Sequence, residues 1–194
     1  MKIIELEEKL MQGHRPDVLV PEGCWVAGGA VRSWFTGEKT SDIDVFAKDE
    51  KTLLSFASAN NLNEVVQEAE KLITYKYSPP VQLIKRYYPD VEATLDSFDF
   101  VICQFAWDGK KIYTTQEAIV STLRKHLGVH KIQKEFALDS LRRMVKYVKK
   151  GYTPCMGTLR DVALVFQSIE KKEEIENQLQ YYPNGAVRKI IRWD

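Results

Sequence analysis

Residues 24–46 read CWVAGGAVRSWFTGEKTSDIDVF, and most inferences about this chain start from them. The apolar run at 24–27 predicts a strand, the glycine pair at 28–29 a tight turn, and residues 30–36 a helix. Residues 42–46 alternate acidic and apolar side chains with period two. That alternation predicts a half-buried strand whose two acids face one side.

The chemistry indicated by this stretch is phosphate and metal binding. Gly28 and Gly29, at a strand-to-helix turn, let backbone N–H groups approach a phosphate, and the helix start adds a partial positive charge. Asp42 and Asp44 place two carboxylates on one strand face, which is how proteins hold Mg²⁺ against a triphosphate. A glycine pair alone is most often only a turn, and a lone DxD is commonly a solvated face. Their combination predicts nucleotidyl transfer.

Composition excludes several classes of protein. The chain has 194 residues, of which 44% are hydrophobic and 28% charged, and its formal charge of +1 gives no global sign of an acidic partner. Its three cysteines are widely spaced and contain no CxxC pair, so we expect reduced, mostly buried thiols. The N-terminus carries acids where a signal peptide carries bases, and no apolar run approaches the ~20 residues of a membrane span. We therefore expect a cytoplasmic protein without a membrane partner.

The rest of the chain is predicted to change character near residue 115. Before it we expect helices at 2–12, 49–60 and 63–72, strands at 81–85 and 111–115 (the latter at a sheet edge), and either a strand or a helix start at 98–104. After it no convincing strand pattern remains. Apolar residues at three- and four-residue steps predict a helix ending at Gly151, whose apolar stripe must pack on something, and a second helix from 158 to 176.

The glycine turn and the DxD together resemble the opening motif of the DNA polymerase β-like nucleotidyltransferase superfamily, and within it of class II (bacterial-type) CCA-adding enzymes and poly(A) polymerases. That motif has the form GGxVRD followed by DxD, and here Ser33 stands where the family has its Asp. The resemblance implies that Asp42 and Asp44 bridge two Mg²⁺ ions. It also implies that Gly28, Gly29 and Arg32 hold the phosphates of a nucleoside triphosphate.

A second block, Asp99 to Asp108, resembles the family's RRDFTINAxxxD, with Ser97 and Phe98 in place of the two arginines. The family takes a third metal carboxylate from a strand that corresponds to residues 81–86, where no acid occurs. Asp99 is the candidate substitute. Its alternatives are a contact to the nucleotide ribose and a structural helix cap.

A third block at 139–142 resembles the family's EDxLR helix, with Leu138 in place of its glutamate. In the family this Asp and Arg offer hydrogen bonds to the edge of the incoming base. The resemblance implies the same contact for Asp139 and Arg142, which lie at i and i+3. It covers about residues 24–152.

A local excess of positive charge lies between residues 124 and 150, which contain nine Lys or Arg and two acidic residues. It indicates either a solvated helix face or a track for the phosphate backbone of RNA. The residues assigned to RNA binding are Arg124, Lys125, Lys131, Lys134, Arg143, Lys146, Lys149 and Lys150. His126 and His130 lack a third ligand for a metal and extend this patch. For Tyr87-Tyr88, packing is favoured over base stacking.

We therefore expect an α+β fold: a nucleotidyltransferase head at residues 1–115, with a small mixed β-sheet flanked by helices, and an all-helical neck-like region at 116–194. The expected activity is template-independent, Mg²⁺-dependent transfer of NMP from an NTP to an RNA 3′ hydroxyl, with a tRNA-like acceptor. Asp42, Asp44 and Asp99 are the candidate catalytic residues. Alternatives are transfer to a protein or small-molecule hydroxyl, and a non-catalytic module that binds NTP or RNA. A homo-oligomer is compatible with this function.

Overall fold

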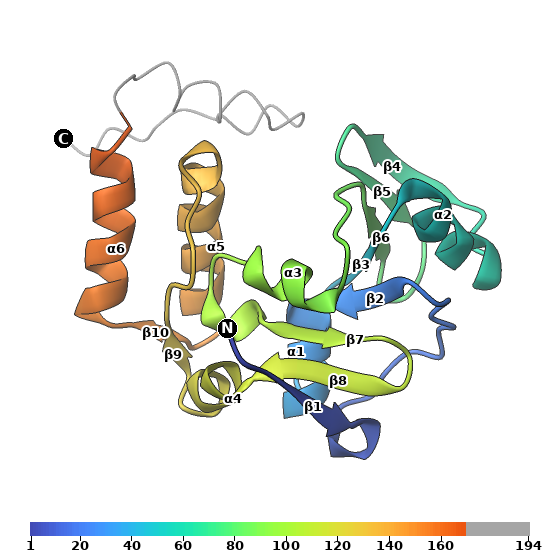
Figure 1. Ribbon diagram of the computed structural model, residues 1–194, viewed down its shortest axis with the longest axis horizontal. Coiled ribbons are helices and arrows are strands. Elements are labelled where there is room, and N and C mark those ends of the chain that lie inside the picture. Colours follow the sequence, from blue (N-terminus) through green and yellow to red (C-terminus); the bar gives the residue numbers. More distant parts are fainter. Residues whose placement is uncertain (170–194) are drawn as a thin grey trace.

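A mixed β-sheet of eight strands is the framework of the molecule. The computed structural model describes residues 1–169 (Figure 1). The strand order is β1-β8-β7-β2-β3-β6-β5-β4, and all neighbours are antiparallel except β3 and β6, which are parallel. The strands are β1 (Ile3–Glu7), β2 (Cys24–Ala27), β3 (Ile43–Ala47), β4 (Val65–Ala69), β5 (Leu72–Tyr75), β6 (Val81–Ile84), β7 (Phe105–Trp107) and β8 (Lys111–Thr115). The α+β class is confirmed, with a larger sheet than expected.

Two segments predicted as helices belong to this sheet. Residues 3–7 form β1, followed by a short 3₁₀ helix, η1 (Glu8–Leu10). Residues 65–75 form the β4–β5 hairpin. Both helix predictions were wrong because the spacing of a few apolar residues fits either period, and pairing with a distant strand decided the outcome. Since β1 lies outside β8, the predicted edge position of 111–115 was also wrong.

Helices cover the two faces of the sheet. α1 (Gly29–Thr36) and α2 (Glu50–Ala59) pack on one face, where Val31, Trp34 and Phe56 join the largest apolar cluster with Ile43 and Val45. α3 (Val91–Asp96) packs on the other face. The segment left open at 98–104 holds a 3₁₀ helix, η2 (Val101–Cys103), and continues into β7. Side chains of β3 therefore alternate between two covered faces.

Residues 116–169 are mainly helical but contain one small parallel strand pair. α4 (Gln116–Leu123) contributes Ala118 to the largest apolar cluster. β9 (His126–Leu127) pairs with β10 (Thr153–Pro154), which the sequence did not predict. Between and after them lie η3 (Lys134–Phe136), α5 (Ala137–Lys149) and α6 (Met156–Gln167). α6 ends at Gln167, earlier than predicted, and the predicted positions 170–176 lie outside the described residues.

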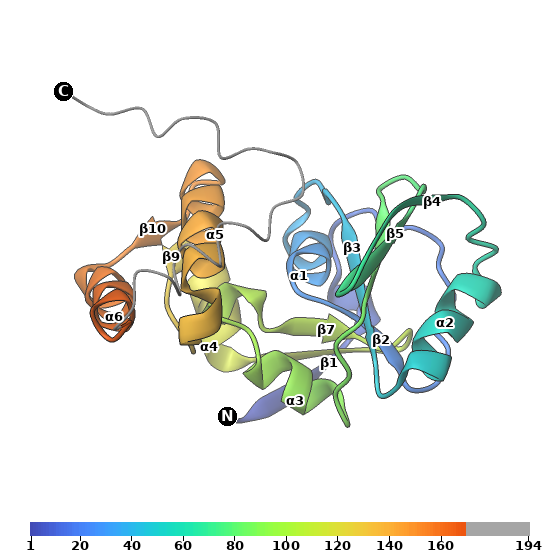
Figure 2. The same cartoon turned by 90° about the horizontal axis from the view of Figure 1, so that it is seen from above.

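The elements form two arms that rise from a common base (Figures 1 and 2). The sheet arm consists of β3 to β6 with α2, and the helical arm consists of α5 and α6. Phe100, Tyr147 and Tyr152 join the helical arm to the base through edge-to-face ring contacts with centroids 5.8 and 6.1 Å apart. The apolar stripe of α5 is only partly covered, since Val145 and Val148 are each 47% exposed.

All three cysteines are free, and of them Cys155 is exposed rather than buried. Among the helices of residues 1–169, none is long and apolar enough to cross a membrane.

Candidate functional site

The glycine turn between β2 and α1 is formed as the sequence predicted. Gly28 has a φ of +84°, a backbone conformation that residues other than glycine rarely adopt. Its N–H donates to the carbonyl of Phe105 at 2.7 Å. No side chain caps the first turn of α1. The N–H groups at that helix start are therefore left without a side-chain acceptor, which suits an anion.

The two predicted metal ligands lie at the start of β3, on the face opposite α1. Asp42 directly precedes the strand and accepts a hydrogen bond from the hydroxyl of Ser41 at 2.7 Å. Asp44 lies inside the strand, beside Gln82 of the parallel strand β6. Both carboxylates are half-buried, whereas the intervening Ile43 is fully buried on the other face. The expected two-sided strand is confirmed.

The carboxyl of Asp44 is electrostatically unusual. Burial and, after it, the neighbouring Asp42 raise the pKa of Asp44 to about 7, and Lys146 and Arg143 partly oppose this shift. A carboxylate that is costly to ionise beside a second carboxylate is stabilised by a cation between them. The same interactions show that α5 brings its cations close to β3.

The residues present fit a divalent cation that is shared with a phosphate. Asp42 and Asp44 supply two carboxylates, and Gln82, on the strand from which the resembling family takes its third carboxylate, lies beside Asp44. Within residues 1–169, no group of three or more His, Cys, Asp or Glu is placed to hold a metal. Mg²⁺ usually binds one or two carboxylates together with substrate phosphates and water. Two carboxylates therefore suffice for a metal that arrives with a nucleotide.

The third candidate carboxylate, Asp99, is engaged by Arg143 of α5. Nε and Nη2 of Arg143 both lie 2.8 Å from Oδ2 of Asp99, whose residue is 5% exposed. The backbone carbonyl of Asp99 accepts from the N–H groups of His130 and Lys131. This arrangement anchors the helical arm to the base. The sequence suggested three roles for Asp99, namely a metal ligand, a ribose contact and a helix cap. The ion pair with Arg143 is a fourth role.

Arg32 is fully buried beneath the glycine turn. Its guanidinium carbon lies 5.1 and 5.3 Å from the ring centroids of Tyr147 and Tyr152, and Nη1 donates to the carbonyl of Ile102 at 3.4 Å. Nε and Nη2 have no hydrogen-bond partner, and Nη2 lies 3.8 Å from the point where a Cβ on Gly29 would be. A buried cation directly below the turn makes that turn more attractive to an anion.

One face of α5 and the residue before it point toward the sheet arm. Phe136, Asp139, Arg143, Lys146 and Lys150 follow one another at steps of three and four, which places them in one row along the helix. We call these five residues the α5 row. Its first member contacts the sheet arm and its later members act on the carboxylates of β3.

The lower end of the α5 row is a concentration of positive charge. Burial, followed by Arg32 and Lys146, lowers the pKa of Lys150, while Asp42 and Glu38 raise it. No carboxylate of residues 1–169 lies within salt-bridge distance of Lys146 or Lys150. Unpaired cations beside a pair of carboxylates that fits a divalent cation are suited to polyphosphate.

Comparison with known proteins identifies the family. A model of the Gabija anti-defense 2 family matches residues 3–125. The chain belongs to this family. Gabija anti-defense 2 of Bacillus phage SPbetaL7 is 28% identical over 161 residues, which is 79% of this chain and 40% of that protein. The chain thus spans about two fifths of the length of this curated relative.

Solved structures confirm the fold that the sequence motifs indicated. A Thermotoga maritima CCA-adding enzyme in complex with tRNA matches 82% of this chain and 39% of its own, with a TM-score of 0.56 and 18% identity. A CCA-adding enzyme in complex with CTP matches 80% and 41%, with a TM-score of 0.58 and 16% identity. This Gabija anti-defense 2 family member therefore has the fold of CCA-adding nucleotidyltransferase heads.

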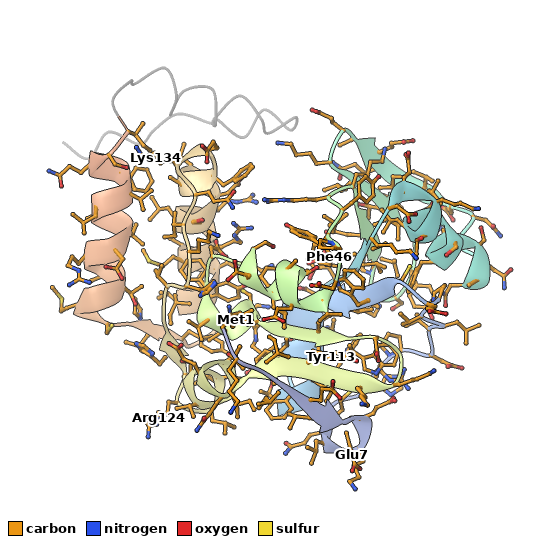
Figure 3. All side chains as sticks on the ribbon, in the orientation of Figure 1. Met1, Glu7, Phe46, Tyr113, Arg124 and Lys134 are labelled. Atoms are coloured by element: carbon orange, nitrogen blue, oxygen red, sulfur yellow. The ribbon has the colours of Figure 1, made fainter. Side chains whose placement is uncertain are left out.

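The remaining basic residues do not form one continuous patch. Arg124 lies at the base of the helical arm and Lys134 at its opposite end (Figure 3). Lys125 pairs with Glu38 and lies over the ring of Tyr152, 4.6 Å from its centroid. The others lie at separate places: Lys131 contacts Asp96, and Arg142 and Lys149 are exposed on α5.

Lys146 and Lys150, assigned from the sequence to an RNA track, face the aspartate pair, which the sequence reasoning missed. The signal was present, because both lie on the helix face of Asp139, which the motif had already assigned to the nucleotide. Phe136, which belongs to the same row, was missed as well.

Proposed function

We propose that this chain is a Mg²⁺-dependent nucleotidyltransferase that transfers NMP from an NTP to an acceptor hydroxyl, with an RNA 3′ hydroxyl as the acceptor. One observation carries the proposal. Asp42 and Asp44 on the sheet arm lie opposite Lys146 and Lys150 on the helical arm, and neither lysine forms a salt bridge within residues 1–169. Residues 1–115 would form the catalytic head and 116–194 the helical region.

Each group has a role that follows from its position. The N–H of Gly28 is already bonded to Phe105, so Gly28 would shape the turn, and the backbone N–H groups from Gly29 onward would bind phosphate oxygens. Arg32 would add positive charge from below. Asp42 and Asp44 would hold Mg²⁺, which when bound supplies charge neutralisation at the phosphates and acidifies the acceptor hydroxyl. Two metal ions would require ligands beyond these two carboxylates.

The transfer itself is an exchange of phosphorus–oxygen bonds. The acceptor oxygen forms a bond to the α-phosphorus, the bond to the bridging oxygen breaks, pyrophosphate leaves and the hydroxyl proton passes to water. Lys146 and Lys150 would offset the negative charge that develops on the pyrophosphate. Asp139 and Arg142, on α5, would contact the edge of the base.

The family supplies a biological setting for this activity. We infer that the chain acts against Gabija defence, as the name of its phage relative states for that protein. Because such a role implies contact with a defence component, a protein hydroxyl is the second candidate acceptor.

The test is transfer of label by the purified chain. Wild type and the Asp42→Asn, Asp44→Asn double variant are incubated with each α-³²P-labelled NTP, Mg²⁺, total RNA and Gabija proteins. Asp17→Asn, an exposed carboxylate, is the matched control. Label on RNA with wild type and the control alone supports the proposal. Label on protein replaces the acceptor, and absence of any label favours a non-catalytic module that binds NTP or RNA.

A further inference from the structure

A cluster of rings and cations joins the outer ends of the two arms. The guanidinium carbon of Arg86 lies 5.5 Å from the ring centroid of Tyr88 and 5.7 Å from that of Phe136, and Nζ of Lys71 lies 5.3 Å from the centroid of Phe136. We call these four residues the outer cluster. Three separate segments contribute to it: the β4–β5 turn, the chain after β6, and the end of η3.

Most of the outer cluster is accessible, and of its members Tyr88 packs against the apolar core on the α3 face. Arg86 and Lys71 are exposed, and Phe136 is half-buried. No carboxylate in the described part of the chain lies within salt-bridge distance of Arg86, and its guanidinium lies over aromatic faces instead. Such an exposed contact contributes only about 0.5–1 kcal/mol to stability. The fold therefore depends little on the cation–ring contacts of Arg86 and Lys71.

The cluster continues the candidate site on both arms. On the helical arm, Phe136 opens the α5 row and lies ten residues, about 15 Å of helix, before Lys146. On the sheet arm, Arg86 follows Gln82, the neighbour of Asp44, by four residues, which span at most about 13 Å because the chain turns after β6. An RNA strand whose 3′ end reacts at the aspartate pair would pass this cluster.

The chemistry of the cluster fits unpaired nucleotides. Aromatic rings and guanidinium planes stack on bases of any sequence, at about 1–3 kcal/mol per base, and cations beside them bind the phosphates. The cluster contains two cations and no acid. That composition favours nucleic acid over a protein partner, for which nothing in the cluster offers an apolar pocket.

We propose that Phe136, Arg86 and Lys71 form a subsite for a single-stranded segment of the acceptor RNA, next to its reacting end. A base stacks on the ring of Phe136 or on the plane of Arg86, and Lys71 and Arg86 bind phosphates. This proposal rests on the proposed function, which places the 3′ end of the RNA at the aspartate pair. The binding step requires neither nucleotide nor metal.

The test measures RNA binding without catalysis. A short fluorescein-labelled oligoadenylate is titrated with the full chain in EDTA, without NTP, and fluorescence anisotropy gives the Kd. Phe136→Leu keeps an apolar side chain but removes the ring, so the Kd should rise about fivefold to tenfold. Arg86→Gln should weaken binding and make the slope of log Kd against log salt concentration shallower by about one.

Tyr87 provides a matched control. It is adjacent to the cluster and is 40% exposed, and among the described residues none of the ring–ring or cation–ring contacts involves its ring. Tyr87→Leu should leave the Kd unchanged, and Phe136→Trp should retain tight binding because it restores a stacking surface. Circular dichroism checks that every variant is folded. If Phe136→Leu fails to fold, Phe136→Trp and Arg86→Gln carry the test.

The outcomes separate this proposal from the proposed function. Wild-type Kd values for both Phe136→Leu and Arg86→Gln, or an equal loss for Tyr87→Leu, overturn the subsite. Tight, Phe136-dependent binding by wild type without any transfer of label would sink the nucleotidyltransferase proposal but keep the subsite. Transfer of label to a protein, together with no oligoadenylate binding, would overturn the subsite but keep the nucleotidyltransferase activity.

Discussion

Replacing Asp44 with asparagine should stabilise the metal-free protein. The pKa of Asp44 is raised from 3.8 to about 7, chiefly by burial and then by Asp42. The folded state therefore holds the Asp44 proton more tightly than the unfolded state does. The stability from this protonation is fully present below pH 3.8 and is lost as the pH rises through about 7. An amide at this position stays neutral and avoids the loss.

The magnitude follows from the shift. About three pKa units at 1.36 kcal/mol each set an upper limit of about 4 kcal/mol on the free energy of unfolding that asparagine recovers at pH 8. Because the carboxylate is only half-buried, solvent screens part of this, and we expect about 2 kcal/mol. For a chain of this length, that corresponds to a Tm increase of about 4–8 °C. At pH 4 the expected gain falls below about 1 kcal/mol.

The assay is thermal and urea unfolding of wild type and Asp44→Asn in EDTA, at pH 4 and pH 8, repeated at pH 8 with Mg²⁺ and an NTP. Asp17→Asn, at an exposed position, should change the unfolding free energy by less than about 0.5 kcal/mol. Ligand addition should stabilise wild type and have little effect on Asp44→Asn. A variant that is less stable than wild type at pH 8, or a gain of equal size at both pH values, would refute the reasoning.

Three further changes test the site. Gln82→Glu adds a third carboxylate beside the aspartate pair, so calorimetry should give about tenfold tighter Mn²⁺ binding, and an unchanged Kd would contradict the metal assignment. Hydrogen bonding, first to His126, lowers the pKa of the exposed Cys155 thiol to about 6, so mass spectrometry should find half-maximal alkylation near pH 6, with His126→Ala moving it higher and the buried cysteines unreactive. Arg143→Gln leaves the carboxylate of Asp99 buried without its cation, so the free energy of unfolding in urea should fall by about 2–4 kcal/mol. Adding Asp99→Asn should recover most of this loss. Strictly additive losses in the double variant would argue against the ion pair.

The parts of the fold that follow from the sequence are those with strong local signals. The positive φ at Gly28 needs a glycine, and the alternation from Asp42 to Phe46 has one period only, so β2, α1 and β3 were predicted correctly. The motif that these three elements carry resembles that of nucleotidyltransferase heads, and solved structures confirm that fold.

The errors lie where local patterns are ambiguous. Val65, Val66, Ala69 and Leu72 fit a helical face, but the chain turns at 70–71 and β5 pairs with β6 through four residue pairs. The exposed strand β4 has no apolar alternation that could have distinguished it. Its position depends on β6, which lies beyond it in the sequence, so the pattern of the segment itself could not have revealed the hairpin.

The candidate site required knowledge of which way α5 faces. A run of nine Lys or Arg looks uniform in sequence, yet a helix sends its members to different sides. The motif resemblance assigns Asp139 to the nucleotide, and steps of seven and eleven residues from it lead to Lys146 and Lys150, whereas Lys149 falls on another side. One residue with an assigned role therefore fixes the phase of the helix. With that phase, residue spacing alone divides the charge run into groups that face the aspartate pair and groups that face solvent.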